Sequence, residues 1–143
     1  MKIAVGNDHA GFEMKEVLLK WLEENDYDFE NFGTNSPESM DYPDVVHPLA
    51  ESVETGKFDF GLLICGSGQG VSFTANKHQG IRAALCWKKE IAELARQHNN
   101  ANVLCLPGRF LSEQEGIDIL KAFLNAKFEG GRHQNRIDKV AVK

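Results

Sequence analysis

Hydrophobic positions follow two patterns that alternate along the chain. Short apolar or alternating runs predict strands, and the stretches between them have apolar residues spaced three and four apart, which predicts helices. The expected strands are residues 2–6, 27–32, 58–65, 81–86 and 102–106, and the expected helices are 10–24, 44–55, 71–77, 88–97 and 112–124. Repeated β-α alternation predicts an α/β fold with a parallel sheet covered by helices on both faces.

Length and composition limit the class of protein further. The 143 residues suit one domain, and we see no internal repeat, low-complexity segment or linker. The net charge of -5 argues against a general nucleic-acid binder. No apolar run is long enough to span a membrane, and the chain enters a strand at once, so we expect neither an anchor nor a signal peptide. Three widely spaced cysteines fit reduced thiols in a cytoplasmic protein.

The strand at 58–65 runs into a glycine-rich turn, and this turn is the first candidate site. Gly66, Gly68 and Gly70 alternate with Ser67 and Gln69. Glycine-rich turns let successive N–H groups converge on one anion. The spacing matches neither a Walker A motif nor a dinucleotide-binding fingerprint. A tight strand–helix connection is the structural alternative.

Cys65 stands immediately before that turn. A thiolate there can act as nucleophile or base, whereas a lone cysteine is more often a small buried apolar residue. We interpret Cys86 and Cys105 in the second way, because no glycine turn follows either of them.

Histidines supply weaker signals. Asp8 and His9 close the first strand, at the edge of the sheet where α/β proteins bind ligands; Asp8 can also serve as a helix N-cap. His98 and Asn99 end a predicted helix, where a histidine often only satisfies the helix dipole. The remaining histidines, His47, His78 and His133, look structural or superficial, and no set of side chains has convincing metal-ligand spacing.

Arginines gather near the C-terminus of this acidic chain. Arg132 and Arg136 are four residues apart, so a helix would place both on one face as a phosphate clamp. Arg109 follows the last predicted strand. Solvated charge on a polar tail is the alternative.

Several short sequence blocks, taken together and in order along the chain, resemble the signature of the type B ribose-5-phosphate isomerase family, which includes galactose-6-phosphate isomerase subunits. The resemblance covers nearly the whole chain and rests on Gly6-Asn7-Asp8-His9-Ala10-Gly11, Asp41-Tyr42-Pro43, Cys65-Gly66-Ser67-Gly68, Ala75-Asn76-Lys77, Gly80-Ile81-Arg82-Ala83, Arg96-Gln97-His98-Asn99, Asn102-Val103-Leu104 and Phe128-Glu129-Gly130-Gly131-Arg132-His133. It implies a Rossmann-like three-layer domain with a five-stranded parallel sheet. It also implies interconversion of ribose 5-phosphate and ribulose 5-phosphate, without metal or organic cofactor, in a homodimer or tetramer.

The same resemblance implies roles for the candidate residues. Cys65 would be the base that moves the proton between C2 and C1, and the N–H groups from Gly66 to Gly70 would hold the enediolate. Ser67, where better-known members carry threonine, would help to relay a proton. His98 would open the furanose ring, and the site would lie between subunits, with residues 128–143 reaching the partner. The substrate-binding residues would be Asp8, His9, Gly66, Ser67, Gly68, Gln69, Gly70, Asn99, Arg109, Arg132 and Arg136.

Departures and alternatives follow from the same comparison. A second branch of the family replaces the cysteine with a nearby glutamate; the matching position here is Val71, which favours the cysteine branch. An isomerase of six-carbon sugar phosphates, such as allose 6-phosphate or galactose 6-phosphate, would share the mechanism. A non-catalytic sugar-phosphate-binding module would use the turn and the arginines but would not need Cys65 with His98.

Overall fold

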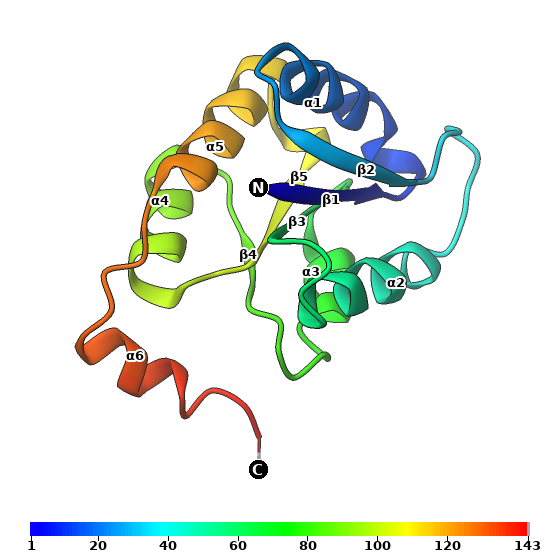
Figure 1. The fold of residues 1–143 in the computed structure, drawn as a ribbon. Coiled ribbons are helices and arrows are strands. Elements are labelled where there is room, and N and C mark those ends of the chain that lie inside the picture. The colour runs from blue at the N-terminus through cyan, green and yellow to red at the C-terminus, as the bar shows by residue number, and fades with distance from the viewer. Residues whose placement is uncertain (143) are drawn as a thin grey trace.

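The computed structural model of the chain describes residues 1–142, and its centre is a five-stranded sheet (Figure 1). All paired strands are parallel, in the spatial order β2-β1-β3-β5-β4. The strands are β1 (Lys2–Asn7), β2 (Asp28–Gly33), β3 (Phe60–Cys65), β4 (Ala83–Leu85) and β5 (Val103–Pro107). The sequence pattern therefore predicted both the number and the parallel arrangement of the strands correctly.

Helices cover both faces of this sheet and give the fold three layers, which confirms the expected Rossmann-like α/β class. The helices are α1 (Phe12–Glu24), α2 (Pro43–Glu54), α3 (Gln69–Ala75), α4 (Lys89–Asn99), α5 (Glu113–Asn125) and α6 (Arg132–Ile137), with 3-10 turns η1 (His9–Gly11) and η2 (Gly108–Phe110). Leu62 and Ile64 of β3 point to the core shared with α1, α4 and α5, whereas Leu63 and Cys65 point to the core shared with α2 and α3.

Local hydrogen bonding explains where the observed boundaries differ from the expected ones. β3 begins at Phe60 because the N–H groups of Lys57 and Phe58 both donate to Ser52 O and close a turn. β4 is shorter than expected because the N–H of Ile81 donates to His78 O. The predicted capping box of α5 is present, with reciprocal bonds between Ser112 and Glu115.

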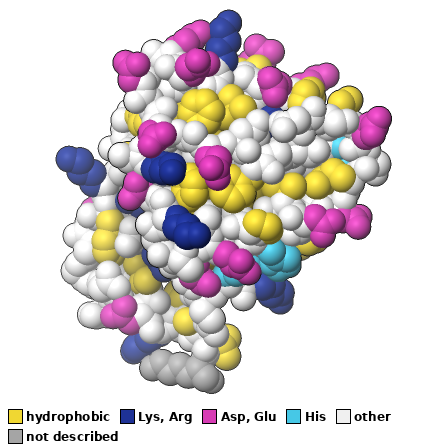
Figure 2. Space-filling model, turned by 45° about the vertical axis from the view of Figure 1, so that its right-hand side comes forward, with side chains coloured by type: hydrophobic (Ala, Val, Ile, Leu, Met, Phe, Trp, Pro, Cys, Tyr) yellow, Lys and Arg dark blue, Asp and Glu magenta, His cyan; other side chains and the backbone are white. Residues whose placement is uncertain are grey.

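The C-terminal segment lies apart from the sheet. In Figure 1, α6 and residues 138–142 extend away from the three layers, and the side chains of Val140 and Val142 are exposed. Charged side chains of both signs are spread over the face in Figure 2, with hydrophobic side chains in a band between them. None of the helices within residues 1–142 is long and apolar enough to cross a bilayer.

Candidate active site

A cavity of about 430 Å³ lies at the carboxyl ends of β1, β3 and β5. Seven of the predicted site residues line it, joined by Ala10, Tyr42, Phe73 and Phe110. The seven are Asp8, His9, Cys65, Gly66, Ser67, Gly70 and Arg109. The topology brings them together because β3 lies between β1 and β5, so the loops after these three strands meet at one edge.

The glycine turn needs its glycines for two different reasons. Gly68 has a φ of 75°, and a Cβ there would lie 2.4 Å from Leu85 Cδ1. At Gly70 a Cβ would lie 2.5 Å from the Tyr42 ring. The turn therefore passes close to its neighbours and leads into α3, whose first N–H groups have no partner within the helix.

Cys65 ends β3, lines the cavity and is 5% exposed. The other two thiols are fully buried, as predicted. Burial raises the pKa of the Cys86 thiol to about 12. Burial, with contributions from Cys65 and Cys86, also raises the pKa of Cys105. These shifts make Cys86 and Cys105 unreactive core residues at neutral pH and leave Cys65 as the thiol beside the cavity.

Asp8 and His9 are held by backbone contacts. The Asp8 carboxylate accepts the N–H of Gly11 at 3.1 Å, so Asp8 is an N-cap, of the 3-10 turn η1 that leads into α1. Asp8 also lines the cavity. The N–H of Met40 donates to His9 Nδ1 at 3.3 Å. Because Nδ1 accepts this bond, a neutral His9 carries its proton on Nε2. His9 is then a hydrogen-bond donor in both of its protonation states.

The segment that carries Met40 and Tyr42 is anchored by Lys15, which is fully buried in α1. Lys15 Nζ donates to Thr34 O at 2.7 Å and to Asn35 Oδ1 at 2.8 Å. Desolvation lowers the pKa of Lys15, an effect only partly opposed by Glu16. The sequence pattern did not reveal this anchor, because a lysine in an amphipathic helix normally faces water.

Arg109 enters the cavity from the loop after β5. The backbone N–H of Arg109 donates to Gly66 O at 3.1 Å. A Cβ added at Gly66 would lie 3.2 Å from Arg109 Cδ and 3.3 Å from Arg109 Nη1. The guanidinium therefore packs directly against the glycine turn. Phe73 and Phe110 are highly exposed although they line the same cavity, and no sequence signal marked either residue.

A second group of predicted residues lies outside this cavity, at the end of α4 and in α6. His98 and Asn99 are the last residues of α4, Arg132 and Arg136 belong to α6, and Asn99 lines a separate hollow of about 560 Å³. Of the remaining predicted residues, Gly68 and Gln69 stay in the glycine turn without lining the Cys65 cavity.

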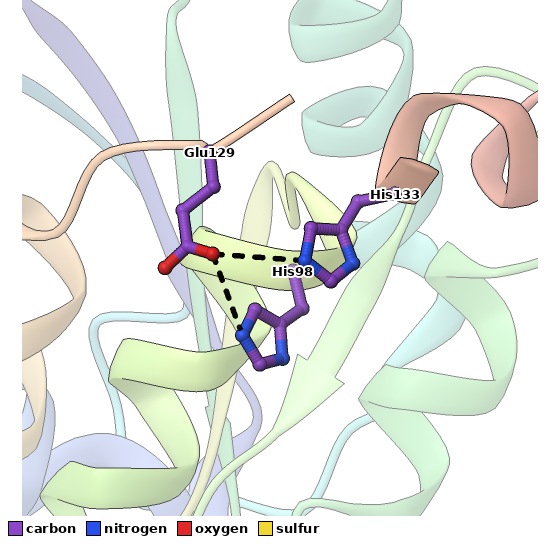
Figure 3. A group of neighbouring side chains, drawn as sticks. All are labelled: His98, Glu129 and His133. Carbon is purple, nitrogen blue, oxygen red and sulfur yellow. Dashed lines mark ion pairs between the residues drawn. The ribbon is translucent and has the colours of Figure 1, made fainter. Parts of the chain in front are cut away.

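His133 is a buried structural residue, one of the two interpretations that the sequence left open, but it has partners that the sequence did not predict. It is only 7% exposed, and its ring stacks on that of His98 with centroids 4.4 Å apart and planes 12° apart. Glu129 Oε1 lies 3.7 Å from His98 Nε2 and 3.6 Å from His133 Nε2 (Figure 3). His47 also has an unexpected partner, since its Nδ1 lies 2.8 Å from Nε2 of His78.

The cluster His98, Glu129 and His133 brings three potential metal ligands within 4.8 Å of one another, a proximity that sequence spacing did not reveal. The orientation of the rings and the charges around them both disfavour a bound cation. The imidazole planes are nearly parallel, so a single ion cannot lie in both planes and meet both lone pairs. The charges of Arg132 and Arg136 also act on His133, and they would repel a cation. The cluster is therefore a stacked pair of histidines beside one carboxylate.

A cavity at the carboxyl ends of a parallel sheet, lined by a few charged and polar side chains, is where α/β proteins bind small molecules. Comparison with known proteins makes the class specific. Residues 3–140 match the family model described as Ribose/Galactose Isomerase. The chain therefore belongs to the ribose/galactose isomerase family.

Individual relatives agree along almost the full length. The chain is 42% identical to ribose-5-phosphate isomerase B of Escherichia coli, over 99% of this chain and 95% of that protein. It superimposes on a Thermotoga maritima ribose 5-phosphate isomerase with a TM-score of 0.96, at 46% identity over 98% of this chain and 97% of the other. The Mycoplasma genitalium ribose-5-phosphate isomerase B, solved with bound ribulose-5-phosphate, gives a TM-score of 0.93 at 44% identity, over 97% and 93% of the two chains.

Proposed function

We propose that this protein interconverts ribose 5-phosphate and ribulose 5-phosphate. The observation that carries the proposal is the single cavity in which Cys65, Asp8, His9 and Arg109 meet beside the glycine turn. Family membership and the ribulose-5-phosphate complex of the Mycoplasma genitalium relative support the choice of substrate. The cavity supplies a base, hydroxyl-binding groups and a cation for a phosphate.

In the proposed reaction, the thiolate of Cys65 removes the proton from C2 of the open-chain aldose. The electrons move to the C1 carbonyl and form an enediolate anion, and the proton then returns to C1 to give the ketose. N–H groups in the turn from Gly66 to Gly70 stabilise the anion, as in an oxyanion hole. The Ser67 hydroxyl relays a proton between the two oxygens. A general base typically contributes about 10²–10⁴-fold in rate.

Ribose 5-phosphate is mostly a ring in solution, so the ring must open before C2 can be deprotonated. We assign this step to His98 as acid and binding of the enediolate region to Asn99. In the described chain, these two residues do not line the Cys65 cavity. We therefore infer a homodimer in which His98, Asn99, Arg132 and Arg136 complete the cavity of the partner. The exposed α6 segment, and Phe73 and Phe110 at the cavity, support such an assembly.

Phosphate binding is proposed for His9, Arg109, Arg132 and Arg136. His9 suits this role because its Nε2–H can donate to a phosphate oxygen whether or not the ring is charged. The predicted tail, residues 128–143, would reach across to the partner subunit; its last residue, Lys143, lies outside the described residues. The proposed chemistry requires neither a metal nor an organic cofactor, and the three free thiols fit a reducing cytoplasm.

The direct test is isomerisation of ribose 5-phosphate by the purified chain, with and without EDTA. We expect activity that survives EDTA and disappears in Cys65→Ala. If ribose 5-phosphate is not converted, allose 6-phosphate and galactose 6-phosphate are the next substrates to assay. Failure with all three sugars would favour a non-catalytic sugar-phosphate-binding module.

A further inference from the structure

Two arginines outside the cavity hydrogen-bond to the C-terminal end of α4. Arg82, which precedes β4, donates from Nε to Asn99 O and to Asn100 O, both at 3.1 Å, and from Nη2 to Asn100 O at 2.9 Å. Arg96, in the last turn of α4, donates from Nη1 to Asn100 Oδ1 at 2.9 Å and to Ala101 O at 2.7 Å. Together the two guanidinium groups bind consecutive carbonyls immediately after His98.

The last carbonyls of a helix have no partner within the helix, and the final turn therefore tends to fray. Here the chain also turns sharply, because Asn100 has a φ of 47°. Guanidinium groups at this end satisfy the carbonyls and interact favourably with the negative end of the helix dipole. His98 and Asn99 are consequently fixed at a helix end that would otherwise be loose.

The arrangement has an electrostatic cost. Arg96 is 9% exposed, with its guanidinium 4.6 Å from the centroid of Phe60. Burial lowers the pKa of both arginines, and the charge of Arg82 lowers the pKa of Arg96 further. Within residues 1–142, neither arginine lies within ion-pair distance of a carboxylate, although the chain has 21 acidic residues. Two like charges are thus held together chiefly by the carbonyls that follow His98.

We propose that Arg82 and Arg96 are positioning residues that hold His98 and Asn99 in place for catalysis. The inference rests on the proposed function for the roles of His98 and Asn99. The stabilisation of the α4 end by the two arginines is independent of activity and can be measured in an inactive protein.

Arg82→Met removes the three hydrogen bonds but keeps a side chain of similar length. We expect turnover of ribose 5-phosphate to fall about tenfold or more, since a small misplacement of a catalytic group can cost up to about 10²-fold. Deuterium uptake at C1 of ribulose 5-phosphate in D2O should fall less, because it needs Cys65 but no ring opening. Arg82→Lys should recover part of the lost turnover. Lys89→Met, at the opposite end of α4, is the matched control and should keep full turnover.

Amide hydrogen exchange tests, independently of the reaction, whether the arginines stabilise the end of α4. The N–H groups of Asn100 and Ala101 donate to Arg96 O and Ala95 O, so their exchange reports directly on this turn. We expect faster exchange of these two amides in Arg82→Met, with the amides of β3 unchanged. Exchange at wild-type rates would overturn the proposal even if the wild-type chain proved inactive as an isomerase. Turnover within twofold of wild type in Arg82→Met would also overturn it.

Discussion

The ring of His133 in α6 lies flat against the ring of His98 at the end of α4, with 4.4 Å between centroids. The N–H of Glu129 donates to Gln97 O at 2.9 Å, which brings the tail against the same helix end. Two proposed functional groups, the acid His98 and the arginines of α6, are therefore built on one cluster. The stack links the position of the tail to the position of the acid.

The histidine stack predicts a pH dependence of stability. Burial, followed by the nearby charges of His98 and Arg132, lowers the pKa of His133 below its ordinary value of 6.5. The unfolded chain therefore binds a proton at a higher pH than the folded chain does. The contribution of neutral His133 to stability is fully present above pH 6.5 and is lost as the pH falls through the lower pKa of the folded state.

His133→Phe keeps a ring for the stack but cannot be protonated. We expect urea unfolding of this variant to depend less on pH below 6.5 than unfolding of the wild type. His47→Phe is the control on an exposed histidine. Equal acid-side losses in wild type and His133→Phe would contradict the prediction.

Lys15 should stabilise the protein by anchoring the segment at 34–42. Lys15→Met leaves Thr34 O without its side-chain donor and removes one of the two donors to Asn35 Oδ1, so we expect a loss of about 1–3 kcal/mol in the free energy of unfolding. Lys20→Met removes an exposed lysine from the same helix, 3.9 Å from Glu24, and should change stability by about 0.5 kcal/mol or less. Chemical denaturation of both variants makes the comparison, and equal effects would rule out the anchor.

The bond from Met40 to His9 predicts the tautomer of His9. Imidazole ¹⁵N shifts should show the proton of neutral His9 on Nε2, and His9→Ala should weaken binding of a phosphorylated inhibitor about tenfold through the loss of one charge-assisted hydrogen bond. A proton on Nδ1 would contradict the observed contact.

Arg136 is the direct test of the proposed phosphate clamp. Arg136→Ala should weaken binding of a phosphorylated inhibitor by about 2–4 kcal/mol if the ion pair is desolvated. Lys139→Ala removes an exposed charge from the same tail and should leave the affinity nearly unchanged. Calorimetric titration measures both, and unaltered affinity in Arg136→Ala would eliminate the clamp.

The sequence is most informative about features that depend on a single strand or helix. Apolar runs predict the strands, and the carboxyl-end rule places Asp8, His9 and Cys65 at one edge of the sheet. It failed where distant elements meet. Hydropathy does not show that Lys15 is buried by the segment after β2, or that His133 of the tail is buried against His98 at the end of α4.

The cavity wall shows the same limit. Phe110 lies beside Arg109 in η2, and its side chain is 75% exposed. Its place at the cavity depends on how three loops meet, which periodicity along a single segment does not encode. Residue spacing does not reveal that Arg82 and Arg96 meet at Asn100, because Arg82 comes from the loop before β4 and binds backbone carbonyls, which carry no sequence signal.

In the proposed enzyme, Cys65 of one subunit works with His98 of another. Cys65→Ala and His98→Asn should each be inactive as purified homo-oligomers. If the two variants are unfolded, mixed in equal amounts and refolded together, half of the dimers are mixed, and each mixed dimer has one intact site. We predict recovery of about a quarter of wild-type activity, from the statistics of a two-fold symmetric pair. If Cys65 and His98 act within one chain, every site keeps one defect, and a mixture without activity would contradict the shared site.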